Sequence, residues 1–397
     1  MAFNGYKLEN AYKAMKNENI DMWIIAGQET STKTEPALNV LCDAEFIGLT
    51  AMIFNQDKTS CAICTPIDKN GYVHQGVFDE VIDFPISFVD TLSEYIARKK
   101  PKKIALNYSL NNPASDGLSY GMYTIIKDAL DKISFNGEIV SAENIMNDVI
   151  EIKTDEELIG IKKAAEIALE IFDLAKSVIK DGIDCQEVFK FFQDEVEKRG
   201  LTYSWPKSCN PAIFAGYGCP TGHKGAPNFI IKKGDLINID FGIIVDGYSC
   251  GLQRMYYLLN EEEEDVPSDL KKDFDVVVEA IDLASKALVP NVTGYQVDKL
   301  VIDFILSKGY QNFTSALGHQ VGQIIHDDGQ LLATSSEYNK RPELLDVPLK
   351  EGYVFRLEPS IISRAGKISI KENVCVRKPE AEFIVPPQKE LILIKEG

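Results

Sequence analysis

The first 150 residues alternate between helix-like and strand-like hydrophobic patterns. Amphipathic stretches predict helices at 6–19, 88–100 and 120–133, and apolar runs predict strands at 20–27 and 102–109. Two further strand-like runs flank the polar residues 55–58, which predicts a hairpin. Strands that alternate with helices are typical of a layered α/β domain, which we expect over residues 1–150.

A long amphipathic helix is predicted to open the second part of the chain. Thr154 and Glu157 have the spacing of a capping box, which satisfies the first free backbone N–H groups of a helix. Apolar residues then recur on one helical face, at Leu158, Ile161, Ala165, Ala168, Phe172 and Ala175. Further helices are predicted at 185–199, 268–288 and 295–308, with mostly strands and turns from 315 onward. We therefore expect a second domain at 151–397.

The segment "LINIDFGIIVDGYSCGLQRMYYL" (236–258) predicts a buried hairpin around Val-Asp-Gly. Its first strand carries one acid, Asp240, in an otherwise apolar run. A buried carboxylate is costly unless it binds something. The returning strand offers no acid, only Gly251, Gln253 and Arg254, so the partner of Asp240 has to come from elsewhere.

Composition excludes several classes of function. The chain has 397 residues, 45% of them hydrophobic, and a net charge of −18, which argues against nucleic acid or an anionic membrane as a partner. No apolar run reaches the length of a membrane span, and the amino terminus has no hydrophobic signal core. Eight scattered cysteines suit free thiols in a reducing compartment, so we expect a cytoplasmic protein.

Three of the four histidines lie in glycine-rich contexts of the second part. His223 stands in "GCPTGHKGAP", and His319 and His326 stand in "ALGHQVGQIIHDDG". Glu358 follows in "VFRLEPSI". Each has an ordinary structural explanation when taken alone, such as a histidine bonded to a carbonyl or a glutamate paired with Arg356. The ordered set is what suggests a site.

Seven markers in order resemble the creatinase–aminopeptidase P–prolidase superfamily. They are "GHKGAP", "KKGDLINIDFG", "DGYSCGLQR", "GHQVG", His326, "LEPSI" and "KENVCV". The resemblance covers nearly the whole chain and implies a creatinase-like α/β domain followed by an α+β pita-bread domain. It also implies a homodimer.

In the metallopeptidase members, the resemblance implies five ligands for two divalent ions. Three positions match, at Asp240, His319 and Glu358. The second aspartate falls on Gly251 and the last glutamate falls on Lys371. Two carboxylates and an ammonium do not offset four positive charges, so we expect no metal cofactor. The alternative is a single manganese, cobalt or zinc ion held by Asp240, His319 and Glu358, with Glu372 turned inward by a bulge.

The resemblance to creatinase suggests metal-independent hydrolysis of a small C–N substrate, an amidine, guanidine or amide. His223 would be the general base and acid, with Glu358, His319 and His326 as further catalytic residues. The substrate-binding candidates are Asp240, Gln253, Arg254, Lys371 and Glu372. Two alternatives stay open: a divergent metal-dependent Xaa-Pro aminopeptidase or dipeptidase that takes dipeptide-sized substrates, and a non-catalytic pita-bread binding protein.

Overall fold

The chain divides into two compact units, residues 1–152 and 153–397. The computed structural model describes residues 5–29, 35–41, 48–110, 112–220, 225–311, 315–327, 329–334 and 345–396. His223 lies outside the described residues. No helix in these ranges is long and apolar enough to cross a membrane.

The N-terminal unit is built on a six-stranded mixed sheet in the order β4-β3-β2-β1-β5-β6. Its strands are β1 (Met22–Gly27), β2 (Thr50–Asn55), β3 (Ser60–Cys64), β4 (Glu80–Asp83), β5 (Lys103–Leu106) and β6 (Glu138–Ser141). Strand β2 pairs antiparallel with both β1 and β3, which confirms the predicted hairpin. The pairs β1–β5, β3–β4 and β5–β6 are parallel.

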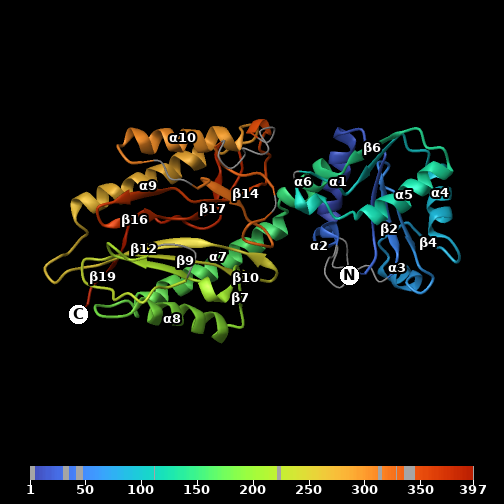
Figure 1. Ribbon diagram of the computed structural model, residues 1–397. Coiled ribbons are helices and arrows are strands. Elements are labelled where there is room, and N and C mark those ends of the chain that lie inside the picture. Colours follow the sequence, from blue (N-terminus) through green and yellow to red (C-terminus); the bar gives the residue numbers. More distant parts are fainter. Residues whose placement is uncertain are drawn as a thin grey trace. The chain divides into compact units, whose positions relative to one another are not determined.

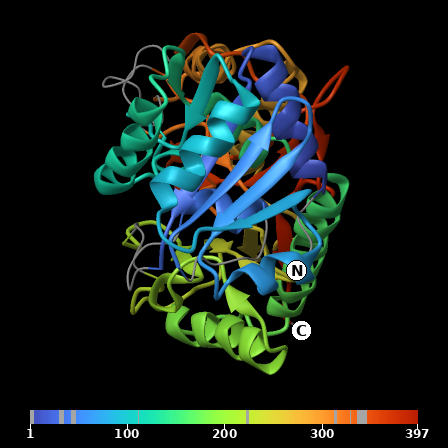
Figure 2. The same ribbon diagram turned by 90° about the vertical axis from the view of Figure 1, so that its right-hand side faces the viewer.

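Helices cover both faces of this sheet (Figure 1, Figure 2). They are α1 (Gly5–Asn17), α2 (Pro36–Leu41), α3 (Lys69–Gln75), α4 (Phe88–Lys99), α5 (Tyr120–Lys132) and α6 (Glu143–Glu151), with the short 3₁₀ turn η1 (Pro113–Ser115). Successive side chains of a strand point to opposite faces. Trp23 and Ile25 therefore pack in the core that includes α1 and α6, whereas Met22 and Ile24 pack in the core that includes α4 and α5. Helix α6 was not predicted from the sequence.

Four long helices frame the C-terminal unit. They are α7 (Asp155–Ala175), α8 (Cys185–Lys198), α9 (Ser268–Ala287) and α10 (Gly294–Ser307). The capping box is confirmed, because the Thr154 hydroxyl accepts from the Glu157 N–H at 3.2 Å while the Glu157 carboxylate accepts from the Thr154 N–H at 2.8 Å. In Figure 1 the strands of this unit lie between the α7–α8 pair and the α9–α10 pair. This arrangement makes it an α+β unit.

The described strands of the C-terminal unit form four small sheets, in the orders β19-β12-β9-β8, β13-β14-β17-β18, β11-β10-β7 and β15-β16. The first half of the unit contains β7 (Thr202–Tyr203), the 3₁₀ turn η2 (Lys207–Cys209), β8 (Ala212–Ala215), β9 (Leu236–Phe241), β10 (Ile243–Val245), β11 (Tyr248–Ser249) and β12 (Leu252–Leu258). The second half contains β13 (Gly318–Gln320), β14 (Val354–Leu357), β15 (Ser360–Ser363), β16 (Gly366–Ser369), β17 (Glu372–Cys375), β18 (Glu382–Phe383) and β19 (Ile392–Ile394).

The predicted hairpin at 236–258 is confirmed and becomes the centre of this unit. Strands β9 and β12 pair antiparallel, with Asp240 opposite Gln253. Asp246 and Gly247 form the tip between β10 and β11, and both adopt positive φ angles, of 50° and 84°. An isolated bridge from Gln253 to Lys371 joins the hairpin to the strand that leads into β17. Residues 236–258 and 354–375 therefore share one interior.

Candidate active site

Two acids and two cations form a buried cluster where β9 meets β14 and the residue before β17. Asp240, Arg356 and Lys371 are each less than a tenth exposed, and the Glu358 side chain is 16% exposed. The Lys371 ammonium lies 3.0 Å from Oδ2 of Asp240 and 2.8 Å from Oε2 of Glu358. We call Asp240, Arg356, Glu358 and Lys371 the charged cluster.

Arg356 contacts the same two acids through the oxygens that Lys371 does not contact. Its Nη2 donates to Oδ1 of Asp240, and its Nη1 lies 3.5 Å from Oε1 of Glu358. Arg356 precedes Glu358 by two residues in an extended segment, so both side chains point to the same face. The guanidinium also lies over the Trp205 ring at 5.6 Å from its centroid, a favourable cation–π distance. As a result, every carboxylate oxygen of the two acids faces a side-chain nitrogen.

The electrostatics of the cluster favour the ionised acids. Burial raises the pKa of Glu358, but Lys371 and Arg356 outweigh it and hold the pKa well below its usual range. The pKa of Asp240 is lowered in the same way, because Arg356 and Lys371 outweigh burial. Conversely, Asp240 and Glu358 outweigh burial at Arg356 and raise its pKa. Two negative charges therefore face two positive ones, and the four residues together carry no net charge.

His319 joins the cluster through Glu358. Its Nε2 lies 2.8 Å from Oε1 of Glu358, and its Nδ1 lies 3.0 Å from the Gln320 carbonyl oxygen. Both ring nitrogens thus face oxygen atoms. The His326 ring lies 4.3 Å from the His319 ring, centroid to centroid, and His326 is an exposed residue. Burial and the neighbouring His319 lower the pKa of His326 to about 4, so this imidazole is neutral near pH 7.

Three other residues predicted to bind substrate are used inside the fold. Arg254 forms a two-armed ion pair with Glu372, at 3.0 and 3.1 Å, and Glu372 also accepts from the Gln388 N–H at 2.8 Å. Lys371 and Glu372 are adjacent in an extended segment, so they point to opposite faces and Glu372 does not turn toward Asp240. The Gln253 amide donates to Asn238 and accepts from Ser369 at 2.9 Å. These contacts stabilise the packing of β12 against β9 and against the segment that leads into β17.

A small pocket adjoins the cluster. It has a volume of about 180 Å³ and is lined by Phe214, Ala215, Gly216, Tyr217, Gly218, Cys219, Leu236, Asn238, Ile362, Ala365, Gly366 and Lys367. This volume is below the roughly 300 Å³ at which pockets for whole drug-sized ligands begin, so it suits one side chain. Lys367 is an exposed residue and has no ion pair or hydrogen bond with another described side chain. Burial, and then the Lys371 charge, lower its pKa. Lys367 was not predicted, and nothing in its sequence context distinguishes it.

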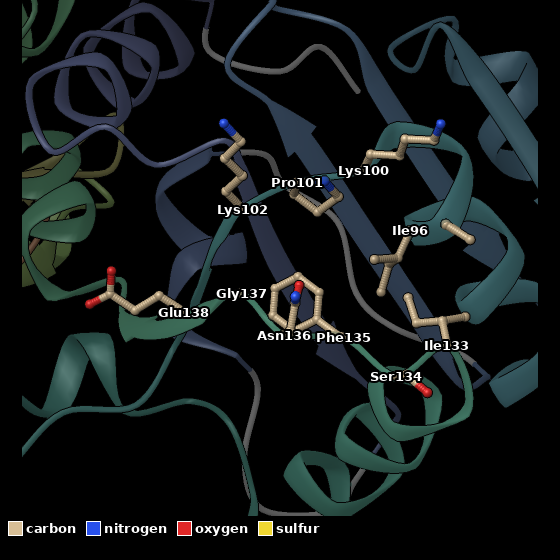
Figure 3. Close-up of a pocket in the computed structure, with 11 residues that line it drawn as sticks. Ile96, Lys100, Pro101, Lys102, Ile133, Ser134, Phe135, Asn136, Gly137 and Glu138 are labelled. Carbon is tan, nitrogen blue, oxygen red and sulfur yellow. The ribbon is translucent and has the colours of Figure 1, made fainter.

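A wider depression, of about 920 Å³, lies in the N-terminal unit. It is formed where α4 and α5 end and β5 and β6 begin, around Phe135 (Figure 3). Its lining includes Lys100, Lys102 and Glu138 but neither histidine nor cysteine. The charged cluster, not this depression, therefore contains the groups suited to catalysis.

The donor set does not fit a two-metal centre. Glycine at 251 supplies no ligand atom, and Lys371 places a positive charge between the two remaining carboxylates. Nε2 of His319 is directed to Glu358. Among the described residues, no group of three or more histidine, cysteine or acidic side chains is placed to hold an ion. The described side chains therefore favour an ion-paired interior, and we derive no chemistry through a metal.

Comparison with known proteins places this site in a family of enzymes. The family model for metallopeptidase family M24 matches residues 160–378. The uncharacterized peptidase YqhT of Bacillus subtilis is 26% identical over 322 residues, which cover 79% of this chain and 82% of that protein. The Xaa-Pro dipeptidase of Pyrococcus furiosus is 27% identical over 279 residues, which cover 69% and 73%.

Solved structures confirm the predicted pita-bread fold. The Xaa-Pro dipeptidase from Bacillus anthracis superposes with a TM-score of 0.68 at 23% identity, covering 98% of this chain and 99% of that one. An X-Pro aminopeptidase from Thermotoga maritima superposes with a TM-score of 0.67 at 21% identity. At these identities the structures establish the fold alone. The predicted homodimer and the predicted role of His223 stay predictions.

Proposed function

Because the chain belongs to metallopeptidase family M24, we propose that it is a hydrolase of dipeptide-sized peptides of the Xaa-Pro class. The observation that carries this proposal is a compact site with both signs of charge beside a pocket for one side chain. A dipeptide is a zwitterion whose two charged ends are only a few ångströms apart. A carboxylate end suits Lys367, and an ammonium end would share Asp240 and Glu358 with Lys371 and Arg356, which already face their oxygens.

The relatives support a peptide over an amidine or guanidine as the substrate. The Pyrococcus furiosus relative is named an Xaa-Pro dipeptidase, and the Bacillus subtilis relative a peptidase. The comparisons therefore support the Xaa-Pro peptidase, which was the alternative in the sequence analysis, better than the creatinase-like hydrolase of an amidine or guanidine. The metal-free route predicted from the sequence also stays part of the proposal, because the donor set does not fit two ions.

In this proposal the side chains of the cluster replace the electrostatic role of metal ions. When water adds to the peptide carbonyl, negative charge develops on its oxygen, and preorganised cations stabilise such charge in a site that excludes water. Lys371 and Arg356 are the cations in place. The proton transfers need a base and an acid, and His223 is the predicted residue for both.

One observation favours a second candidate, a protein that binds the peptide without cleaving it. Both ring nitrogens of His319 are engaged, and the oxygens of Asp240 and Glu358 all face cations. Each of these described groups is therefore already engaged with another side chain or a carbonyl oxygen. Under this candidate the cluster only recognises the charged ends of the peptide.

Assays on the full-length protein separate the two candidates. With Ala-Pro and Gly-Pro we expect proline release that persists in the presence of a chelator and is lost in His223→Ala. Saturable binding in calorimetry without proline release would establish the binding protein instead. Release that depends on added manganese, cobalt or zinc would establish the metal-dependent peptidase. If the protein shows no binding and no release with these dipeptides, the proposed ligand class is refuted.

A further inference from the structure

Gly251 is the position where the family resemblance implies the second aspartate, and the space beside it is filled. A Cβ atom at this position would lie 2.5 Å from Cδ1 of Ile325, 2.9 Å from Cζ of Arg356 and 3.1 Å from its Nε. Contacts under about 3.0 Å force a neighbour to shift. The guanidinium therefore takes up the room that a side chain at 251 would use.

The same guanidinium leaves one buried donor without an acceptor. Nε of Arg356 has no hydrogen-bond partner among the described residues, although the side chain is almost fully buried. Its Nη atoms are directed to Asp240 and Glu358. Cζ and Nε are the guanidinium atoms closest to a Cβ atom at position 251, at 2.9 and 3.1 Å, so the two residues form one packing unit.

The last glutamate that the family resemblance implies falls on Lys371, so a cation stands where an anion is expected. It lies at the point where Asp240 and Glu358 approach each other. Its ammonium contacts Oδ2 of the first and Oε2 of the second. The Gln253–Lys371 bridge fixes the backbone at this point, so the ammonium is held in position from the hairpin side. A cation therefore already occupies the position between the two carboxylates.

We infer that Arg356 and Lys371 are the permanent cations of this site and take the place of the two divalent ions. The glycine at 251 is part of the same change, because it leaves room for the Arg356 side chain. The three positions then form one unit: the glycine makes room for the guanidinium, and the two side-chain cations offset the charges of Asp240 and Glu358. The inference concerns ion binding alone, so it stands whether or not Xaa-Pro dipeptides are the ligand.

The inference predicts which substitutions create a metal site. In the triple variant Gly251→Asp, Arg356→Met, Lys371→Glu, four carboxylates face His319, and methionine fills the volume of the arginine without its charge. We expect this variant to bind about two Mn²⁺ ions per chain, as in two-metal hydrolytic sites, while the wild type shows no saturable uptake. The double variant that keeps Arg356 should bind at least ~10-fold more weakly, because one positive charge remains among the ligands.

Isothermal titration of tag-free protein with Mn²⁺, together with elemental analysis after dialysis, measures the uptake directly. Asp240→Asn in the triple background is the control and should abolish uptake. Stoichiometric uptake by the wild type that is lost in wild-type Asp240→Asn would overturn the inference. So would a folded triple variant that takes up no ion. Circular dichroism reports whether the triple variant folds, and if it does not, the wild-type titration with its Asp240→Asn control still decides.

Discussion

The ammonium of Lys371 lies 2.8 Å from Oε2 of Glu358, next to the point where Leu357 of β14 pairs with Glu372 of β17. The same ammonium reaches Asp240 on β9, so one lysine connects β9, the end of β14 and the start of β17. Removing one partner of a buried ion-paired group leaves the remaining charges uncompensated. Lys371 is therefore part of the site and also contributes to the stability of the C-terminal unit.

Lys371→Met should destabilise the C-terminal unit by about 3–5 kcal/mol, the usual cost of breaking a buried pair from one side. Asp240 and Glu358 would each lose a cation while remaining buried. Trp205, which packs on Arg356, reports unfolding of this unit by fluorescence in a Trp23→Phe background. Lys180→Met is the matched control, because Lys180 is exposed. It should change the free energy of unfolding by less than about 0.5 kcal/mol, and an equal effect of the two variants would contradict the prediction.

Gly251→Ala should lower stability by roughly 1–3 kcal/mol, because the added methyl overpacks the space held by Arg356 and Ile325. Gly121→Ala is the control: Gly121 lies in helix α5 with nothing within 4 Å of a Cβ atom. That change should be neutral or stabilise by up to ~1 kcal/mol. Thermal unfolding followed by calorimetry measures both, and a tolerated alanine at 251 would show that the guanidinium can move aside.

Lys367→Met should raise KM for a dipeptide with a free carboxylate and leave kcat nearly unchanged, since the contact is made equally in the ground and transition states. We expect about a 10-fold rise for Ala-Pro, as a lost charge-assisted hydrogen bond gives, and little change for Ala-Pro-amide. Lys367→Arg should restore most of the affinity. Equal effects on the acid and the amide would place the carboxylate elsewhere, and for a binding protein the same comparison is made with Kd.

Asp298→Asn should flatten the dependence of stability on pH. Burial raises the pKa of Asp298 to about 7 in the folded chain, above the roughly 3.9 of an unfolded aspartate. The folded state therefore binds more protons between these values, and its stability falls as pH rises from about 4 to about 7. The stability gain from asparagine should grow from about pH 4 to about pH 7 and then level off. Urea titrations at several pH values measure it, and a gain that does not vary with pH would exclude Asp298 as the titrating group.

Local order follows from the sequence by itself. The capping box at Thr154, the apolar run of β1 and the turn at Asp246-Gly247 depend on nearby residues, and all three occur in the structure. The departures at Gly251 and Lys371 are likewise visible from motif positions. These features are predictable because short-range sterics and backbone hydrogen bonding determine them.

Only the tertiary structure decided which charges meet. Arg356 was predicted only as a partner of Glu358, but the register of β14 against the rest of the unit brings it to Asp240 as well. Arg254 and Glu372 were candidates for substrate, and their ion pair depends on strands more than a hundred residues apart in the chain. A carboxylate in an apolar strand shows that a partner must exist, because burying it alone is too costly. Which cation fills that role depends on long-range strand pairing, which the local sequence pattern does not determine.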